Sequence, residues 1–190
     1  MMTPNQTILT SQKPRTGNWL QTFSGISFYP LDPQPEDINI ADIAHGLAMT
    51  CRFAGQCQKF YSVAQHSVLV SQVCKPEDAL WGLLHDASEA YLVDMPKPLK
   101  ILPEFKWFVE VENRVQLAVS KHFGISEVQP ESVHSADRAL LMTEKRDLML
   151  NVELRPWQIK FDEEPLLFVI EPLGPEEAKA LFLSRFKELT

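Results

Sequence analysis

The spacing of apolar residues predicts a chain built mainly of helices. Apolar side chains recur every three or four positions, which gives a helix one buried face. Five helical stretches are expected at about residues 40–48, 62–73, 76–91, 104–122 and 131–150, and a sixth from Gly174 to about Leu189. The expected fold class is therefore mainly α.

Signals at the ends of these stretches support the boundaries. Ser62 is a good N-cap for the second helix, with Gln65 three residues later as its capping-box partner. Pro76 and the two acids that follow it suit the positive end of the next helix. Gly124 is expected to end the long helix before it.

Two stretches lack the helical period. The aromatic, β-prone segment WLQTFSGISFY at 19–29 predicts a small hairpin with its turn at Ser24-Gly25. The segment LRPWQIKFDEEPLLFVIE at 154–171 predicts a second small β element, a hairpin around 162–165. The expected organisation is a flexible N-terminal arm at 1–17 and one domain over 18–190.

Composition argues against several classes of protein. A net charge of −7 disfavours binding to a nucleic-acid backbone, although it leaves a single nucleotide open as a ligand. We expect no membrane-spanning helix and no signal peptide, because no apolar run is long enough for either. The three cysteines, Cys51, Cys57 and Cys74, form no CxxC motif and indicate a reducing compartment. A cytoplasmic protein without nucleic-acid or membrane partners is therefore expected.

Three expected helices carry side chains that bind divalent metals. His85 and Asp86 are adjacent in WGLLHDASEAYLVDMPKPLK (81–100), and His66 and Asp137 belong to two other helices. Imidazole nitrogen and carboxylate oxygen suit ions such as Zn, Mn, Co, Fe or Mg. Adjacent residues of a regular helix point about 100° apart, so His85 and Asp86 share one ion only near its surface or where the helix bends. Glu89 lies on the same face as His85, where a carboxylate can accept a proton from an attacking water.

Taken singly, these residues have simpler structural explanations. A lone His66 is more often a hydrogen-bonded core histidine, and a lone Asp137 is more often a helix-surface or cap acid. His134, three residues before Asp137, could be an extra ligand. The charged residues around Glu144 on the same helix are interpreted as mostly a solvated face.

Three segments taken together carry a more specific signal. YSVAQHS (61–67), LLHDASEAYLVDMPKPLK (83–100) and SADRALLMTEKRDLM (135–149) resemble, in this order, the HD-domain phosphohydrolases. The likeness is closest to small bacterial and phage 5′-deoxynucleotidases and deoxynucleoside triphosphohydrolases. It covers about residues 18–150 and, more loosely, the C-terminal helix. It implies an HD-domain helical bundle with one or two small β-hairpins.

The resemblance also implies a role for each matching residue. Its metal ligands, for one divalent ion (Zn, Co, Mn or Mg), would be His66, His85, Asp86 and Asp137. Glu89 would orient or deprotonate the attacking water, and Asp94 would hydrogen-bond the sugar at its 3′-hydroxyl.

The resemblance extends to residues that would bind the substrate. Those enzymes carry an Arg-Trp pair upstream of the first histidine, and Arg52-Phe53 lies at nearly that distance here. Arg52 could pair with a phosphate bidentately, and Phe53 could leave a ribose 2′-hydroxyl unpaired against an apolar wall. Lys97 could also reach a phosphate. Phe53 in place of tryptophan, and Val93 in place of glycine, depart from the pattern and bear on sugar selectivity.

The expected activity is hydrolysis of 2′-deoxynucleotides, with a metal-activated water attacking phosphorus. The sequence leaves two substrates open: a monophosphate giving nucleoside and phosphate, or a triphosphate such as dATP giving nucleoside and triphosphate. The alternative is a non-catalytic, metal-stabilised nucleotide-binding or regulatory module of the same fold. Apolar faces on the later helices predict a homodimer or larger homo-oligomer.

Overall fold

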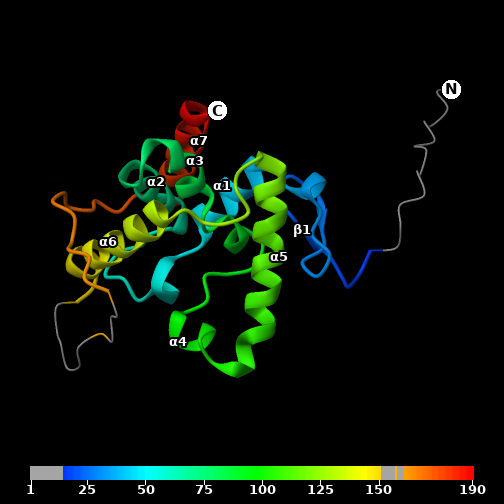
Figure 1. The fold of residues 1–190 in the computed structure, drawn as a ribbon, viewed down its shortest axis with the longest axis horizontal. Helices are drawn as coiled ribbons and strands as arrows, with labels where there is room; N and C mark the ends of the chain where they lie inside the picture. The colour runs from blue at the N-terminus through cyan, green and yellow to red at the C-terminus, as the bar shows by residue number, and fades with distance from the viewer. Residues whose placement is uncertain (1–14, 151–156, 158–160) are drawn as a thin grey trace.

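The computed structural model describes residues 15–150, 157 and 161–190, and helices make up most of these ranges (Figure 1). The α-helices are α1 (Ile40–Met49), α2 (Val63–Val73), α3 (Ala79–Leu84), α4 (Lys97–Lys100), α5 (Lys106–Phe123), α6 (Glu131–Leu148) and α7 (Pro175–Leu189). Single 3-10 turns are η1 (Pro35–Asp37), η2 (Arg52–Gly55), η3 (Pro76–Asp78), η4 (Ala87–Ala90) and η5 (Pro103–Phe105). The antiparallel strands β1 (Leu20–Gln21) and β2 (Ser27–Phe28) pair Leu20 with Phe28.

The mainly α fold class with one small hairpin is confirmed. The first expected hairpin is the β1–β2 pair, which turns through Gly25 at a φ of 88°. The second expected hairpin is wrong where it can be compared, because residues 161–171 contain no strand. The rest of that stretch, 154–156 and 158–160, lies outside the described residues, as do residues 1–14 of the expected arm. At the end of the arm, Arg15 donates to the carboxylates of Asp32 and Asp37.

Helix α2 lies at the centre of the fold, in contact with α1, α3, α6 and α7. Its apolar residues Val63, Val68 and Val70 are fully buried. The expected cap is present, since Ser62 Oγ accepts a hydrogen bond from Gln65 N at 3.2 Å. The capping box is not formed, because the Gln65 side chain turns to the segment before α7. There its Nε2 donates to the backbone oxygen of Glu171, 2.7 Å away.

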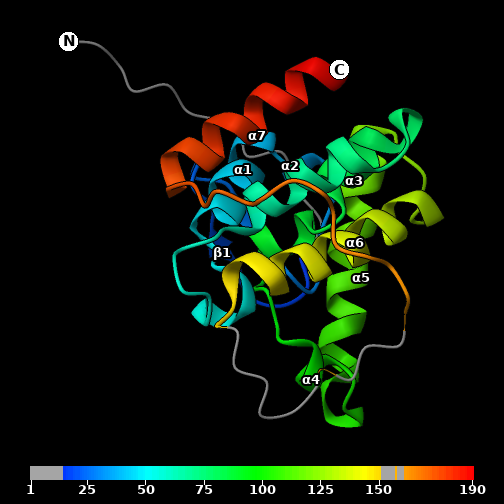
Figure 2. The same cartoon turned by 90° about the vertical axis from the view of Figure 1, so that its left-hand side faces the viewer.

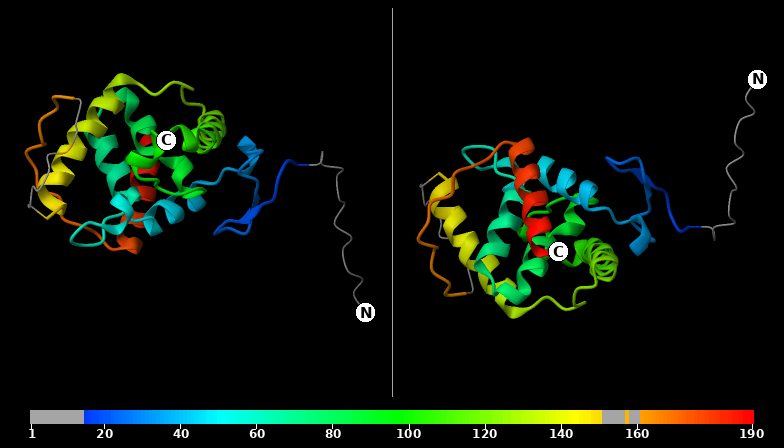
Figure 3. Two further views of the ribbon diagram at one scale, coloured as in Figure 1. Left: turned by 90° about the horizontal axis from the view of Figure 1, so that it is seen from below. Right: turned by 90° about the horizontal axis from the view of Figure 1, so that it is seen from above.

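The long helices pack on this centre through single apolar stripes. Helix α5 buries Phe108, Val111 and Val115 at helical spacing and ends at Gly124, whose φ of 66° suits glycine. Helix α7 crosses α1 and α2 on the outside of the bundle (Figures 2 and 3). Its fully buried Phe182 contributes about 1.5–3 kcal/mol relative to an exposed side chain. Within the described ranges, none of the helices has the length and apolarity needed to cross a bilayer.

Helix α1 and the turn η4 approach each other at Gly46. A Cβ atom there would lie 2.6 Å from the backbone oxygen of Ala90 and 2.9 Å from its Cα. These are backbone atoms of η4, so they cannot turn aside as a side chain could. The close contact fixes η4, which carries Glu89, against α1.

We therefore expect Gly46→Ala to destabilise the protein. Alanine is the better helix former by about 1 kcal/mol, but the contact with Ala90 makes the net change a loss of about 1–3 kcal/mol. Urea denaturation measures the loss. Gly174→Ala is the control for a methyl group without a close contact, because its nearest neighbour, Glu177 Oε2, would lie 3.7 Å away. Gly174 is the N-cap of α7, so the poorer capping by alanine should cost only about 0.5–1 kcal/mol. Equal losses from the two variants would show that the contact at Gly46 is unimportant.

Candidate metal centre

Two buried histidines from different helices face each other. His66 lies in α2 and His85 directly follows α3, and their Nε2 atoms are 3.2 Å apart. His66 Nδ1–H donates to Glu144 Oε1 at 2.7 Å, and His85 Nδ1–H donates to the backbone oxygen of Gly82 at 2.8 Å. Each acceptor needs the hydrogen on Nδ1, so both Nε2 atoms carry a lone pair when the rings are neutral.

Two carboxylates complete this group of donor atoms. Asp86 Oδ2 lies 3.2 Å from His85 Nε2 and 3.6 Å from His66 Nε2. Asp137 Oδ1, from α6, lies 3.2 Å from His66 Nε2. Donor atoms of His66, His85 and Asp86 all fall within 4.8 Å of one another, so this buried group could hold a metal ion. The structure thus groups three of the residues that the sequence proposed as ligands, and the fourth, Asp137, contacts this group at His66. Their nitrogen and oxygen donors suit borderline or hard divalent ions.

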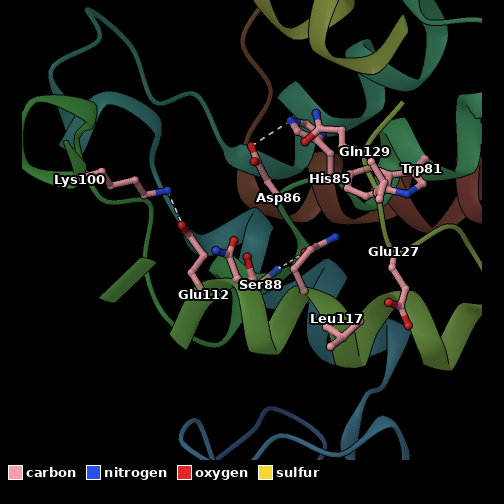
Figure 4. A pocket seen from close by; sticks show the side chains of 12 residues that line it. Trp81, His85, Asp86, Ser88, Lys100, Glu112, Leu117, Glu127 and Gln129 are labelled. Carbon is pink, nitrogen blue, oxygen red and sulfur yellow. Dashed lines mark hydrogen bonds and ion pairs between the residues drawn. The ribbon is translucent and has the colours of Figure 1, made fainter. Parts of the chain in front are cut away.

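A break in the chain's helical path lets His85 and Asp86 reach the same point. The expected continuous helix over 76–91 is wrong: α3 ends at Leu84, and η4 begins at Ala87. In a continuous helix, the backbone N–H of Asp86 would donate to Gly82 O. Here the His85 ring competes for that carbonyl, and Asp86 adopts φ −103° and ψ 16°. The bend points both side chains toward each other (Figure 4).

The charged side chains of the group shift one another's pKa values. Burial and Arg52 act to lower the pKa of His66, but Glu144 and Asp137 outweigh them and raise it to about 9. Burial acts to raise the pKa of Asp137, but its hydrogen bond to His66 lowers it to about 2. The pKa of Asp86 is also lowered, against the effect of burial, by His85, His66 and Arg52. Deprotonated carboxylates beside imidazoles are the state that binds a metal.

Glu144 is a site residue that the sequence analysis missed. It is fully buried, so interpreting it as part of a solvated helix face is wrong. Its Oε1 accepts from His66, and its Oε2 accepts from Arg52 Nη2 at 3.0 Å. The signal was its spacing, because Glu144 continues the buried stripe of Ala136 and Leu140 at intervals of four residues.

Glu89 lies in η4 as a buried acid. Its Oε1 accepts from Lys100 Nζ at 3.4 Å, and its Oε2 is buried without a partner among the described residues. Burial, followed by the charges of Asp86 and Asp94, raises the pKa of Glu89 well above its usual range. Lys100 is shared, since its Nζ also donates to Glu112 at 2.6 Å. Glu89 is therefore suited to hold and release a proton.

The residues proposed to bind substrate differ in burial and in their distance from the candidate ligands. Asp94 is partly buried, and burial raises its pKa. Phe53 has a φ of 53°, a left-handed conformation that is rare outside glycine, and its ring lies 5.3 Å from the Arg52 guanidinium carbon. Lys97 is exposed on α4 and does not line the cavity described below, whereas Lys100 does.

A cavity of about 570 Å³ opens beside His85 and Asp86 (Figure 4). It lies between the end of α3, the helix α5 and the loop before α6, and Trp81, Lys100 and Gln129 are among its lining residues. Its volume is that of a typical small-molecule site. A ligand in this cavity would have one end at the candidate metal ligands.

The comparisons with known proteins place the chain in a family without assigning an activity. No family model matches it. The uncharacterized protein YfdR of Escherichia coli K12 is 40% identical over 176 residues, which cover 91% of this chain and 96% of YfdR. The chain belongs to the YfdR family. An uncharacterized protein of Rhodobacter capsulatus is 34% identical over 183 residues, 88% of this chain and 93% of its own.

We expect this member of the YfdR family to be stabilised by a divalent ion. Zn²⁺ or Co²⁺ added to EDTA-treated protein should raise the melting temperature, since an ion at 100 times its dissociation constant contributes about 2.7 kcal/mol. The shift should disappear in His66→Gln and in Asp86→Asn. His122→Gln is the matched control. His122 lies near the C-terminal end of α5, where it donates to the backbone oxygen of Pro35 and contacts none of the candidate ligands in the structure. An equal shift in all variants would place the ion elsewhere.

Proposed function

We propose that this protein is a divalent-metal-dependent phosphohydrolase of 2′-deoxynucleotides. The observation that carries the proposal is the convergence of two histidines and two aspartates from α2, the α3–η4 bend and α6. His66, His85, Asp86 and Asp137 would hold one ion. When bound, the ion would acidify a water for attack on phosphorus and offset charge on the phosphoryl oxygens.

Glu89 supplies the acid–base chemistry in this proposal. Attack by a water molecule forms one phosphorus–oxygen bond and breaks another, so the water gives up a proton and the departing sugar oxygen takes one up. A buried carboxyl group with a raised pKa is suited to this transfer, and the pKa of Glu89 is raised well above its usual range. Its unpartnered Oε2 is the atom assigned to the transfer.

The nucleoside part of the substrate is assigned to the space next to the bend. The cavity beside His85 has the volume for it. Asp94, which is assigned to the 3′-hydroxyl, is not among the residues that line this cavity. The proposal includes two substrates, a deoxynucleoside monophosphate and a triphosphate such as dATP. They are told apart by the product, which is phosphate for the first and triphosphate for the second.

We further propose a cytoplasmic homodimer or larger homo-oligomer. Large apolar side chains are exposed on the segment around α4 and the start of α5, including Ile101 at 72% and Trp107 at 61%. Exposed apolar patches of this kind mark contact surfaces. The cysteines of the described residues are unpaired, which agrees with a reducing compartment.

We expect Glu89→Gln to abolish hydrolysis without removing the ion. The measurement is product mass from a panel of deoxynucleoside mono- and triphosphates and their ribonucleotide counterparts, with Mn²⁺, Co²⁺, Zn²⁺ or Mg²⁺ added. Loss of a positioned acid–base group should lower kcat by about 10²–10⁴-fold. The metal content should stay at the parental level.

The control for this variant is Glu110→Gln, which changes an exposed glutamate on α5 and should keep the parental rate. Absence of turnover in the parent protein with every ion and every nucleotide would reject the hydrolase. Metal-dependent nucleotide binding without turnover would instead support the non-catalytic module.

A further inference from the structure

Arg52 and Glu144 form a buried ion pair behind the candidate ligands. Glu144 Oε2 accepts from Arg52 Nη2 at 3.0 Å, while Arg52 Nη1 lies 3.6 Å from Asp86 Oδ2. The other oxygen of Glu144 accepts from His66 at 2.7 Å. Glu144 and Arg52 therefore connect one candidate ligand, His66, to another, Asp86, through a chain of polar contacts.

Glu144 depends on both of its partners. It is fully buried, and it lies in the apolar stripe of α6. If Arg52 turned away to bind a phosphate, Glu144 Oε2 would lose its ion pair and remain charged and buried, with the Tyr61 hydroxyl as its remaining neighbour. Stranding one member of a buried ion pair in this way is strongly unfavourable. The pair is therefore stable only as long as Arg52 stays where it is.

Arg52 is also held from its backbone. Its N–H donates to the backbone oxygen of Tyr61 at 2.9 Å, next to the N-terminus of α2. The two residues after it, Phe53 and Ala54, both have positive φ values of 53° and 50°, which fold η2 tightly at this point. The Nε atom of Arg52 is buried and has no partner in the described part of the chain, so it faces no solvent where a ligand could reach it.

We propose that Glu144 positions the metal ligand His66, and that Arg52 is committed to Glu144 and Asp86 rather than to the substrate phosphate. The inference rests on the metal site of the proposed function and not on its substrate. It replaces the phosphate-binding role that the family resemblance implies for Arg52. Glu144 fixes the hydrogen of His66 on Nδ1 and leaves Nε2 free for the ion.

The test uses Co²⁺ as the probe and compares Glu144→Gln, Arg52→Met and the double variant with the parent protein. Co²⁺ binding to EDTA-treated protein is followed by its visible absorption, which reports the ligand geometry. Inorganic phosphate is then titrated into the Co²⁺-loaded proteins. Glu110→Gln is the control, because Glu110 is exposed on α5, where its carboxylate pairs with Lys106.

Glu144→Gln should weaken Co²⁺ binding about 10–100-fold and change the absorption spectrum. Arg52→Met should leave phosphate affinity within about threefold of the parent, while the double variant should bind Co²⁺ within about threefold of the weaker single variant. Glu110→Gln should leave both the Co²⁺ affinity and the spectrum at parental values.

Two results would overturn the inference. One is a Glu144→Gln protein with parental Co²⁺ affinity and spectrum. The other is an Arg52→Met protein that loses phosphate affinity about 10–100-fold, as expected when a bidentate phosphate contact disappears. None of these measurements needs turnover. A protein that hydrolyses no deoxynucleotide but shows the expected Co²⁺ results would reject the proposed function and keep this inference.

Discussion

The fold holds together several atoms with lone pairs that repel one another, namely two imidazole nitrogens and two carboxylate oxygens. His66 Nε2 and His85 Nε2 face each other at 3.2 Å, and both rings have their Nδ1 hydrogen engaged elsewhere. Carboxylate oxygens of Asp86 and Asp137 lie equally close. Glu144 and Asp137 favour the protonated form of His66 and raise its pKa to about 9, against the effects of burial and of Arg52. A divalent ion at this position would replace the proton and supply more positive charge.

The rest of the fold keeps this repulsive group from spreading apart. His66 has no exposed surface, and α2 is enclosed by four other helices. Arg185 of α7 donates to the side chain and backbone oxygen of Ser71, one turn beyond His66. Gln65, the neighbour of His66, is bonded to the segment before α7 at Glu171. Helix α7 and the segment before it thus stabilise the position of α2, although their residues lie outside the candidate site.

Sequence patterns predicted five of the helices and pointed to four candidate ligands, of which the structure groups His66, His85 and Asp86 and places Asp137 beside His66. Long stripes and end signals such as Ser62 and Gly124 depend on neighbours along the chain, so they can be read locally. The break after Leu84 could not be predicted in this way, because it involves the hydrogen bond from the His85 ring to the backbone oxygen of Gly82. Glu144 was misjudged for a similar reason. Its charged neighbours suggested solvent, while its partners, His66 and Arg52, come from distant parts of the chain.

Lys97 and Lys100 illustrate the same limit. Both are cations of one short segment, and pattern alone favoured Lys97 because it stands between two prolines. In the structure, α4 turns Lys100 toward Glu89 and Glu112 and leaves Lys97 exposed. The direction in which each lysine side chain of this short helix points is set by packing against other elements, which the local sequence does not show.

The environment divides the acids of the site into two kinds. Burial raises the pKa of every one of them, but the outcome depends on what each acid faces. The pKa is lowered for the acids beside histidine or Arg52, which are Asp86, Asp137 and Glu144. It is raised for those on the side of Lys100, which are Glu89, Asp94 and Glu112. The acids beside histidine or Arg52 thus favour the ionised state that binds a cation, while those on the side of Lys100 favour the protonated state more than an exposed acid does. This division of charge agrees with the proposed hydrolysis at phosphorus and adds to the convergence of the four candidate ligands, which carries that proposal.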